Sequence, residues 1–486
     1  MVLKQLLIAR NASILLITDV ISKILQTVLS IIIAHRLGAS DLGLLAFAVS
    51  FSAMFSFIPN FGFMNFISRE VAKYPEKSGS YFINLVVIKL VLSLITFLII
   101  FIGSQFMAVP HEQLMLVYLA ALIMLMDSFI LFYTAFFRGF QKAEYEALIL
   151  ISENFLIAAT GILIISLGYG LLFMMIVRVL VVIAIFVAGF MVLKIRFIPP
   201  SHKIDLNSCH HLIKSAAPFT FLAALVIVNA QIGTVLLTQL KGTLYTGWYS
   251  AALKLCGIFQ FIPASVAGAI LPGMTRYARD SDRGNLIKTF CKSFKYLLIL
   301  MLPIATGISI LADKVILFIY NEDFINSILT LRILIWLIVL SFSNSIFNVA
   351  FASINREKIF VHIQVIGTIT NVLLNLWLIP IFGQNGVAIA TISSQFVVFI
   401  FAAFYVSKYY GTIKYSSIWF KPAIASLIML ASITLTRSHH LILVILLAMV
   451  IYAGLLFLLK VFDNEEITFL KTGLSKFCHV FNQHNA

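Results

Sequence analysis

The sequence predicts an all-α membrane protein with fourteen transmembrane helices: two six-helix lobes related by a parallel repeat, followed by two C-terminal helices. Three observations lead to this fold class. Hydrophobic residues make up 61% of the 486-residue chain and charged residues only 11%, whereas soluble domains are about 45–50% apolar and about 25% charged. The apolar residues form runs long enough to cross a bilayer, and one stretch recurs in the second half. This composition excludes soluble enzymes, disordered proteins and disulfide-rich scaffolds.

Fourteen segments contain the roughly 20 apolar residues that a membrane-spanning helix needs. They lie at 12–35, 42–66, 81–104, 114–137, 147–167, 171–193, 212–239, 246–271, 293–319, 328–353, 359–381, 386–407, 420–436 and 440–459. With the N-terminus in the cytoplasm, the cytoplasmic segments carry 25 Lys and Arg residues and the opposite side carries 4. Because basic residues concentrate in cytoplasmic loops, we expect a multi-pass protein of the cytoplasmic (inner) membrane with both termini inside. The same bias explains the net charge of +15 without a nucleic-acid partner.

The repeat relates residues 38–59 to residues 242–263 at an offset of 204, without gaps. Seven of the 22 aligned positions are identical, and they include glycine and proline residues, which often interrupt helices. These matched pairs are Gly38 with Gly242, Gly43 with Gly247, and Pro59 with Pro263. An offset of six spans gives both halves the same orientation, which is typical of two-lobed transporters that work by alternating access. Because proline kinks helices, Pro59 and Pro263 are predicted to be hinge positions.

The repeat also predicts the domain boundaries. Residues 1–195 hold spans 1–6 and form the N-lobe, and residues 212–410 hold spans 7–12 and form the C-lobe. A cytoplasmic linker at 196–211 joins them. Spans 13 and 14 occupy 411–460, outside the repeat, and residues 461–486 are expected to form an amphipathic tail on the cytoplasmic membrane surface.

Eight ionisable residues fall inside the predicted spans, five basic and three acidic. Each costs at least about 2.5–3.5 kcal/mol at bilayer depth, so such residues usually face a cavity or a partner. Four cations are predicted to line a central cavity and to bind a pyrophosphate and its glycan: Lys23, Lys89, Arg178 and Lys254. Arginine grips phosphate bidentately and lysine attracts it as a point charge. The three carboxyl groups are predicted to be counter-ions or coupling sites: Asp19, Asp127 and Glu153.

No catalytic or metal-binding motif accompanies these charges. The sequence has no Walker A motif, no HExxH and no GxSxG, which argues against an ATPase, a zinc protease and a serine hydrolase. We therefore expect neither an enzyme nor a resident cofactor or metal. Protons, sodium ions and the membrane potential remain open as driving forces, since buried carboxyl groups take up protons readily.

Two stretches carry a resemblance to a known family. The run AHRLGASDLGLLAFAVSF at 34–51 is similar to the LGxxxxGxY/F signature of the polysaccharide-transport family of the MOP superfamily. The run RGFQKAEYEA at 138–147 resembles the polar loop after that family's fourth span. The family contains the flippases for O-antigen and related lipid-linked oligosaccharides and is distantly related to the MATE exporters. The resemblance covers nearly the whole chain.

The resemblance implies a flippase for an undecaprenyl-pyrophosphate-linked oligosaccharide, such as an O-antigen or exopolysaccharide repeat unit. Its partners would be this polyprenyl-linked substrate, membrane lipids, and polysaccharide polymerase or assembly proteins. Two alternatives stay open. A MATE-like ion-coupled drug exporter would favour an acidic cavity, whereas basic residues outnumber acidic ones here. A membrane glycosyltransferase, polymerase or ligase usually carries its site on a large external loop, and no such loop is predicted.

Overall fold

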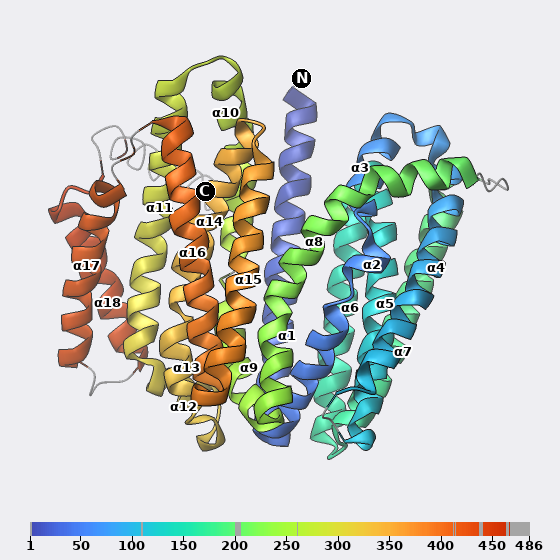
Figure 1. Ribbon diagram of the computed structural model, residues 1–486, viewed down its shortest axis with the longest axis horizontal. Helices are drawn as coiled ribbons and strands as arrows, with labels where there is room; N and C mark the ends of the chain where they lie inside the picture. Colours follow the sequence, from blue (N-terminus) through green and yellow to red (C-terminus); the bar gives the residue numbers. More distant parts are fainter. Residues whose placement is uncertain are drawn as a thin grey trace, which may run out of the picture.

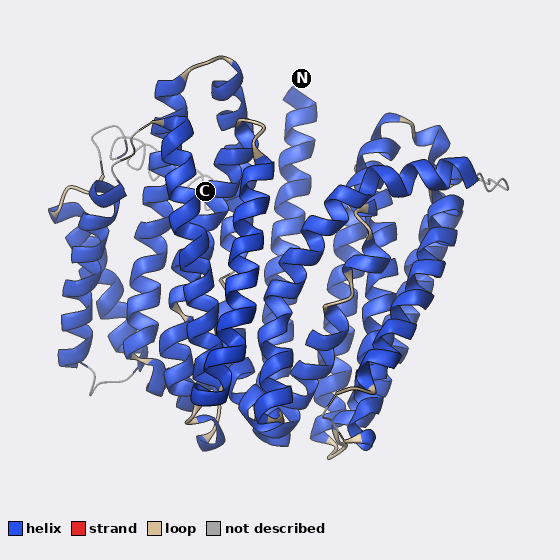
Figure 2. Cartoon of the chain, viewed as in Figure 1, coloured by secondary structure: helices blue, strands red, loops and turns tan. Residues whose placement is uncertain are grey.

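The computed structural model describes residues 2–107, 110–199, 206–259, 261–411, 413, 415–436, 441–462 and 466. Every regular element in this part of the chain is a helix (Figure 2). Two bundles lie side by side, with α1 and α8 between them, and the pair α17 and α18 lies at one edge (Figure 1). The prediction of an all-α membrane fold is confirmed.

The helices follow the chain order of the two predicted lobes. The N-terminal bundle consists of α1 (Val2–Ala53), α2 (Phe57–Asn60), α3 (Phe63–Lys73), η1 (Pro75–Lys77), α4 (Ser78–Ser104), α5 (His111–Gly139), α6 (Ala143–Ser166) and α7 (Leu171–Arg196). The C-terminal bundle consists of α8 (Leu206–Lys241), α9 (Thr243–Gly257), α10 (Phe261–Arg279), α11 (Arg283–Ile310), α12 (Ala312–Ile319), η2 (Glu322–Phe324), α13 (Ser327–Leu334), α14 (Trp336–Ser353), α15 (Glu357–Phe382) and α16 (Gln384–Tyr410). The last pair is α17 (Tyr415–Thr436) and α18 (Leu441–Leu458).

The predicted count of fourteen spans is not confirmed. All fourteen predicted segments fall on helices, but those at 42–66, 246–271, 293–319 and 328–353 are each divided into shorter helices. Within the described residues, eleven helices are long and apolar enough to cross a membrane, and Ile442–Leu458 is a shorter apolar helix. A hydropathy window averages over a break in the backbone, so the sequence pattern could not reveal these interruptions.

The internal repeat is visible in the backbone. Gly38, with φ of 81°, divides α1 into a long helix and a short one. Gly242, with φ of 91°, joins the long α8 to the 15-residue α9 in the same way. Positive φ values of this size are readily accessible only to glycine, which explains why both halves retain it. Pro59 and Pro263 lie at matched breaks, the former in the short α2 and the latter in the first turn of α10.

The C-terminal pair packs against the C-lobe through a hydrophobic cluster of its own. Met429 and Ile433 of α17 meet Leu456 of α18 and Leu311, which follows α11. The Tyr452 hydroxyl donates a hydrogen bond of 2.9 Å to the carbonyl of Ile299 in α11. Most of the other described core residues form one larger cluster that runs through both bundles. Most of the predicted tail, and residues 200–205 of the predicted linker, lie outside the described residues.

Candidate functional site

The two lobes meet most tightly where the repeated glycines face each other. A Cβ atom added to Gly43 would lie 1.8 Å from the carbonyl oxygen of Thr243, and one added to Gly247 would lie 1.8 Å from that of Ala39. The hydroxyl oxygens of Ser40 and Thr243 are 2.9 Å apart across the same junction. We call this junction between α1 and α9 the interlobe contact. It lies at the end of the molecule opposite the N-terminus (Figure 1).

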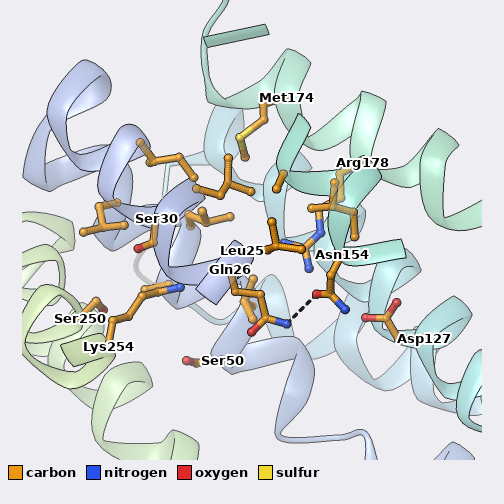
Figure 3. Close-up of a pocket in the computed structure, with 18 of the residues that line it drawn as sticks. Leu25, Gln26, Ser30, Ser50, Asp127, Asn154, Met174, Arg178, Ser250 and Lys254 are labelled. Carbon is orange, nitrogen blue, oxygen red and sulfur yellow. Dashed lines mark hydrogen bonds between the residues drawn. The ribbon is translucent and has the colours of Figure 1, made fainter. Parts of the chain in front are cut away.

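A cavity of about 440 Å³ lies next to the interlobe contact, between the lobes. Helices α1, α5, α6 and α7 line it on one side, and α8 and α9 on the other (Figure 3). Its polar lining residues are Gln26, Ser30, Ser50, Asp127, Glu153, Asn154, Arg178, Thr234, Ser250 and Lys254. The structure therefore gathers four of the seven predicted charged residues in one place.

Two cations from opposite lobes point into this space. Arg178 comes from α7 and Lys254 from α9, and Figure 3 shows their charged ends directed toward Gln26 from opposite sides. The Nε atom of Arg178 is buried and has no hydrogen-bond partner among the described residues. Lys23 is not part of the lining, but it and Arg178 are the cations close enough to act electrostatically on Lys254. The site thus offers positive charge on both walls.

The acidic residues lie on the N-lobe wall. Asp127 on α5 and Glu153 on α6 are close enough to interact electrostatically, and Arg178 acts on both. Arg178 therefore faces two carboxyl groups on its own lobe, whereas Lys254 forms no ion pair with any carboxylate among the described residues.

The structure places Lys89 elsewhere than predicted. Its side chain is 1% exposed inside the N-lobe and donates hydrogen bonds to the carbonyl of Pro59, at 2.7 Å, and to the hydroxyl of Ser128. The rings of Phe129 and Phe132 lie 5.3 and 5.8 Å from its ammonium. A helix break leaves carbonyls without backbone partners, and Lys89 supplies a donor to the one at Pro59. In this structure it ties down a helix break and does not line the cavity.

Asp19 and Lys23 also differ from the expected arrangement. Both side chains are exposed on α1 and neither lines the cavity. Asp19 instead acts electrostatically on the ion pair between Arg138 and Glu146, at the junction of α5 and α6. Their spacing of four residues correctly predicted that the two side chains share one face of α1. It did not predict which residues lie next to them.

Uncharged residues complete the site. Gln26 and Ser30 extend the polar face of α1 that begins with Asp19 and Lys23, as the sequence pattern indicates. Asn154 was not predicted as a site residue. The Gln26 amide donates a hydrogen bond of 2.9 Å to the amide oxygen of Asn154 (Figure 3). Asn154 in turn donates to the hydroxyl of Ser22, at 3.2 Å. These bonds link α1 to α6 across the cavity wall. Neutral amides carry little burial penalty when paired, so they leave no clear signal in a hydropathy pattern; the adjacent Glu153 was the nearest available pointer to Asn154.

Known proteins with this architecture are membrane transporters. The structure of the lipid II flippase MurJ in an inward closed conformation superposes with a TM-score of 0.70, at 18% identity, over 90% of this chain and 97% of that chain. An inward-facing multidrug resistance MATE family transporter of the MOP superfamily gives 0.62, at 16% identity, over 80% of this chain and 95% of that one. At identities this low, the superpositions show a shared fold and nothing more.

Sequence comparison decides the family. The model of the polysaccharide biosynthesis protein family matches residues 8–278, and that of the lipid II flippase MurJ matches residues 146–463. The chain belongs to the polysaccharide biosynthesis protein family and to the lipid II flippase MurJ family, since each model covers more than half of it. The Bacillus subtilis lipid II flippase MurJ is 24% identical over 436 residues, which is 79% of each chain. Membership in this flippase family agrees with the predicted transporter and with a function other than enzymatic catalysis.

Proposed function

We propose that the protein moves a lipid-linked oligosaccharide across the cytoplasmic membrane, with its pyrophosphate held between the two lobes. The observation that carries this proposal is the convergence of Arg178 and Lys254 on one cavity from opposite sides. Two cations on facing walls suit a group with two negative phosphates, since charge-assisted hydrogen bonds to phosphate are the strong ones. The related flippase MurJ acts, by its name, on lipid II.

The substrate class follows from the resemblance to polysaccharide flippases, and the cavity is compatible with it. A space of about 440 Å³ between apolar helices accepts the phosphates and the first sugars, whereas a long polyprenyl chain would stay in the bilayer. We infer an undecaprenyl-pyrophosphate-linked repeat unit of the O-antigen or exopolysaccharide type. A polymerase or another assembly protein would receive it on the far side.

The direction of transport follows from the distribution of basic residues. With both termini in the cytoplasm, as the positive-inside rule requires, the interlobe contact lies on the outer side of the membrane. The conformation is then closed outside, and the substrate enters from the cytoplasm. Rocking of the lobes, with Pro59 and Pro263 as bending points, would open the contact and release the headgroup outward. Asp127 and Glu153 would act in this cycle as counter-ions to Arg178 or as the coupling site.

The test is mass spectrometry of lipid-linked oligosaccharides in a strain that lacks the protein. Complete lipid-linked units should accumulate, and wild-type protein should clear them. A charged hydrogen bond contributes about 1.5–3 kcal/mol, so Arg178→Ala and Lys254→Ala should each reduce clearance at least about tenfold. Arg69→Ala and Lys73→Ala are matched controls, because these side chains are 66% and 57% exposed on α3.

Each other outcome has a defined meaning. Truncated units would indicate a glycosyltransferase, and an unchanged lipid pool with altered drug sensitivity would favour the exporter. Full clearance by the double variant Arg178→Ala with Lys254→Ala, at wild-type protein levels, would refute the cationic cavity while leaving flippase activity intact.

A further inference from the structure

A second basic site lies far from the central cavity, where α11, α17 and α18 come together. Five lysine side chains surround a hollow of about 430 Å³. These residues, which we call the lysine pocket, are Lys288, Lys292, Lys295, Lys421 and Lys460. They belong to the N-terminal halves of α11 and α17 and to the segment just after α18. These helix ends lie on the same side of the molecule as the N-terminus (Figure 1).

The lysine pocket already holds one anion from the chain itself. Lys295 Nζ donates to both carboxylate oxygens of Glu466, at 2.9 and 2.8 Å, and the Tyr296 hydroxyl donates to the same group at 2.7 Å. The ammonium of Lys292 is 3.9 Å away. Glu466 is only 6% exposed. The pocket therefore has the geometry and the charge to desolvate and retain an anionic group.

One carboxylate does not balance the pocket. Asp463 and Glu465 neighbour Glu466 in the sequence, and even with both counted the lysines outnumber the carboxyl groups five to three. Like charges this close repel, so a further anion would stabilise the arrangement. The ammonium groups of Lys421 and Lys295 also donate to backbone carbonyls after the end of α18. Lys421 donates to the carbonyl of Lys460 at 2.9 Å and Lys295 to that of Val461 at 3.2 Å, and each ammonium group has three N–H donors in all.

The surroundings of the pocket identify the anion. The pocket lies at the ends of membrane-spanning helices, where phospholipid headgroups are the most concentrated anions, and basic pockets between helices on this side bind such headgroups. Along α17, Phe420 is 66% exposed and Leu427 60% exposed. These side chains extend an apolar surface from Lys421 toward the bilayer interior, where acyl chains would lie.

We propose that the lysine pocket binds the phosphate of an anionic phospholipid, which fastens α17 and α18 to α11. The bound lipid adds a polar fastening to the apolar cluster that Met429, Ile433 and Leu456 form along the same seam. Phosphate is the recognised chemistry, and the acyl chains distinguish a lipid from a free phosphate ion. The proposal is independent of the transported substrate, because none of the five lysines lines the central cavity.

The experiment uses the purified full-length protein in detergent. Phosphatidylglycerol, phosphatidylcholine and inorganic phosphate are titrated separately, with native mass spectrometry and thermal unfolding as readouts. Phosphatidylglycerol should bind and raise the unfolding temperature, and the other two should not. Each lysine near an anionic headgroup contributes about fivefold in affinity, so Lys288→Gln with Lys460→Gln should weaken binding about 25-fold. Both side chains are exposed, so the variant should fold.

Three results would overturn the proposal. Undiminished phosphatidylglycerol binding in the double variant would exclude the pocket as the site. Equal stabilisation by phosphatidylcholine would exclude recognition of the anionic headgroup, and equal stabilisation by inorganic phosphate would identify a free-anion site. The double variant Arg69→Gln with Lys73→Gln is the matched control and should bind as wild type does. Glu466→Gln should tighten binding, because it removes an anion that competes for the same lysines.

Discussion

Replacing Gly247 by alanine should force the interlobe contact open. The added Cβ would lie 1.8 Å from the carbonyl oxygen of Ala39 and 2.6 Å from its carbonyl carbon. Both neighbours are backbone atoms, so no side chain can rotate away. A carbon atom approaches a carbonyl oxygen to about 3.3–3.6 Å, so α1 and α9 must separate by about 1.5 Å.

The cost of this clash falls on one conformation only. Overpacking a tight interface costs about 1–3 kcal/mol, and the strain disappears once the lobes part. A difference of that size shifts the equilibrium between the closed and open contact by about 5–150-fold. Gly43→Ala should act equally, because its Cβ would lie 1.8 Å from the carbonyl oxygen of Thr243.

Distance measurements between spin labels can test the shift. The labels replace Leu167 on the N-lobe and Phe318 on the C-lobe, which are 65% and 69% exposed near the end where the lobes meet, after the four native cysteines have been substituted. Gly247→Ala should add a population at longer distance. Gly257→Ala is the matched control on the same helix, since its Cβ would meet nothing within 4 Å. An unchanged distance distribution in folded Gly247→Ala protein would refute the reasoning.

Three further predictions concern other contacts of the site. Cysteines at Ser40 and Thr243 should form a disulfide, since the two hydroxyl oxygens are 2.9 Å apart; oxidation should stop transport and reductant should restore it. Lys89→Met should lower the thermal unfolding temperature, because a buried carbonyl left without its donor costs about 1–3 kcal/mol. Asp127→Asn with Glu153→Gln should tighten substrate binding, because the two carboxyl groups act on Arg178 and compete with phosphate for it.

Each of these predictions has a contrary result. Continued transport by the cross-linked protein would mean that the interlobe contact need not open. A Lys89→Met protein as stable as the wild type would show that another group bonds the carbonyl at the break. A double carboxyl variant with the substrate affinity of the wild type would show that the pair does not compete with the substrate for Arg178.

The sequence predicted the fold better than the site, and two lysines show why. Lys89 and Lys254 both fall inside predicted spans, and a hydropathy pattern gives their depth. It does not give the direction in which each side chain leaves its helix. That direction decides that Lys89 donates to the Pro59 carbonyl and that Lys254 lines the cavity. The repeat succeeded because the conformations of Gly38 and Gly242 depend on glycine itself. The bond between Gln26 and Asn154 depends on tertiary packing and left no local signal.

The short helices after Gly38 and Gly242 connect the interlobe contact mechanically to the cavity. On each, a glycine of the contact precedes a cavity residue by seven positions, Gly43 before Ser50 and Gly247 before Lys254. Seven residues are about two helical turns, roughly 10 Å, so both members of each pair lie on one face of one rigid rod. A ligand that pulls on Lys254 therefore loads the contact directly, with no loop between them to absorb the strain. The same two helices therefore determine both how the cavity binds a ligand and how firmly the interlobe contact stays closed.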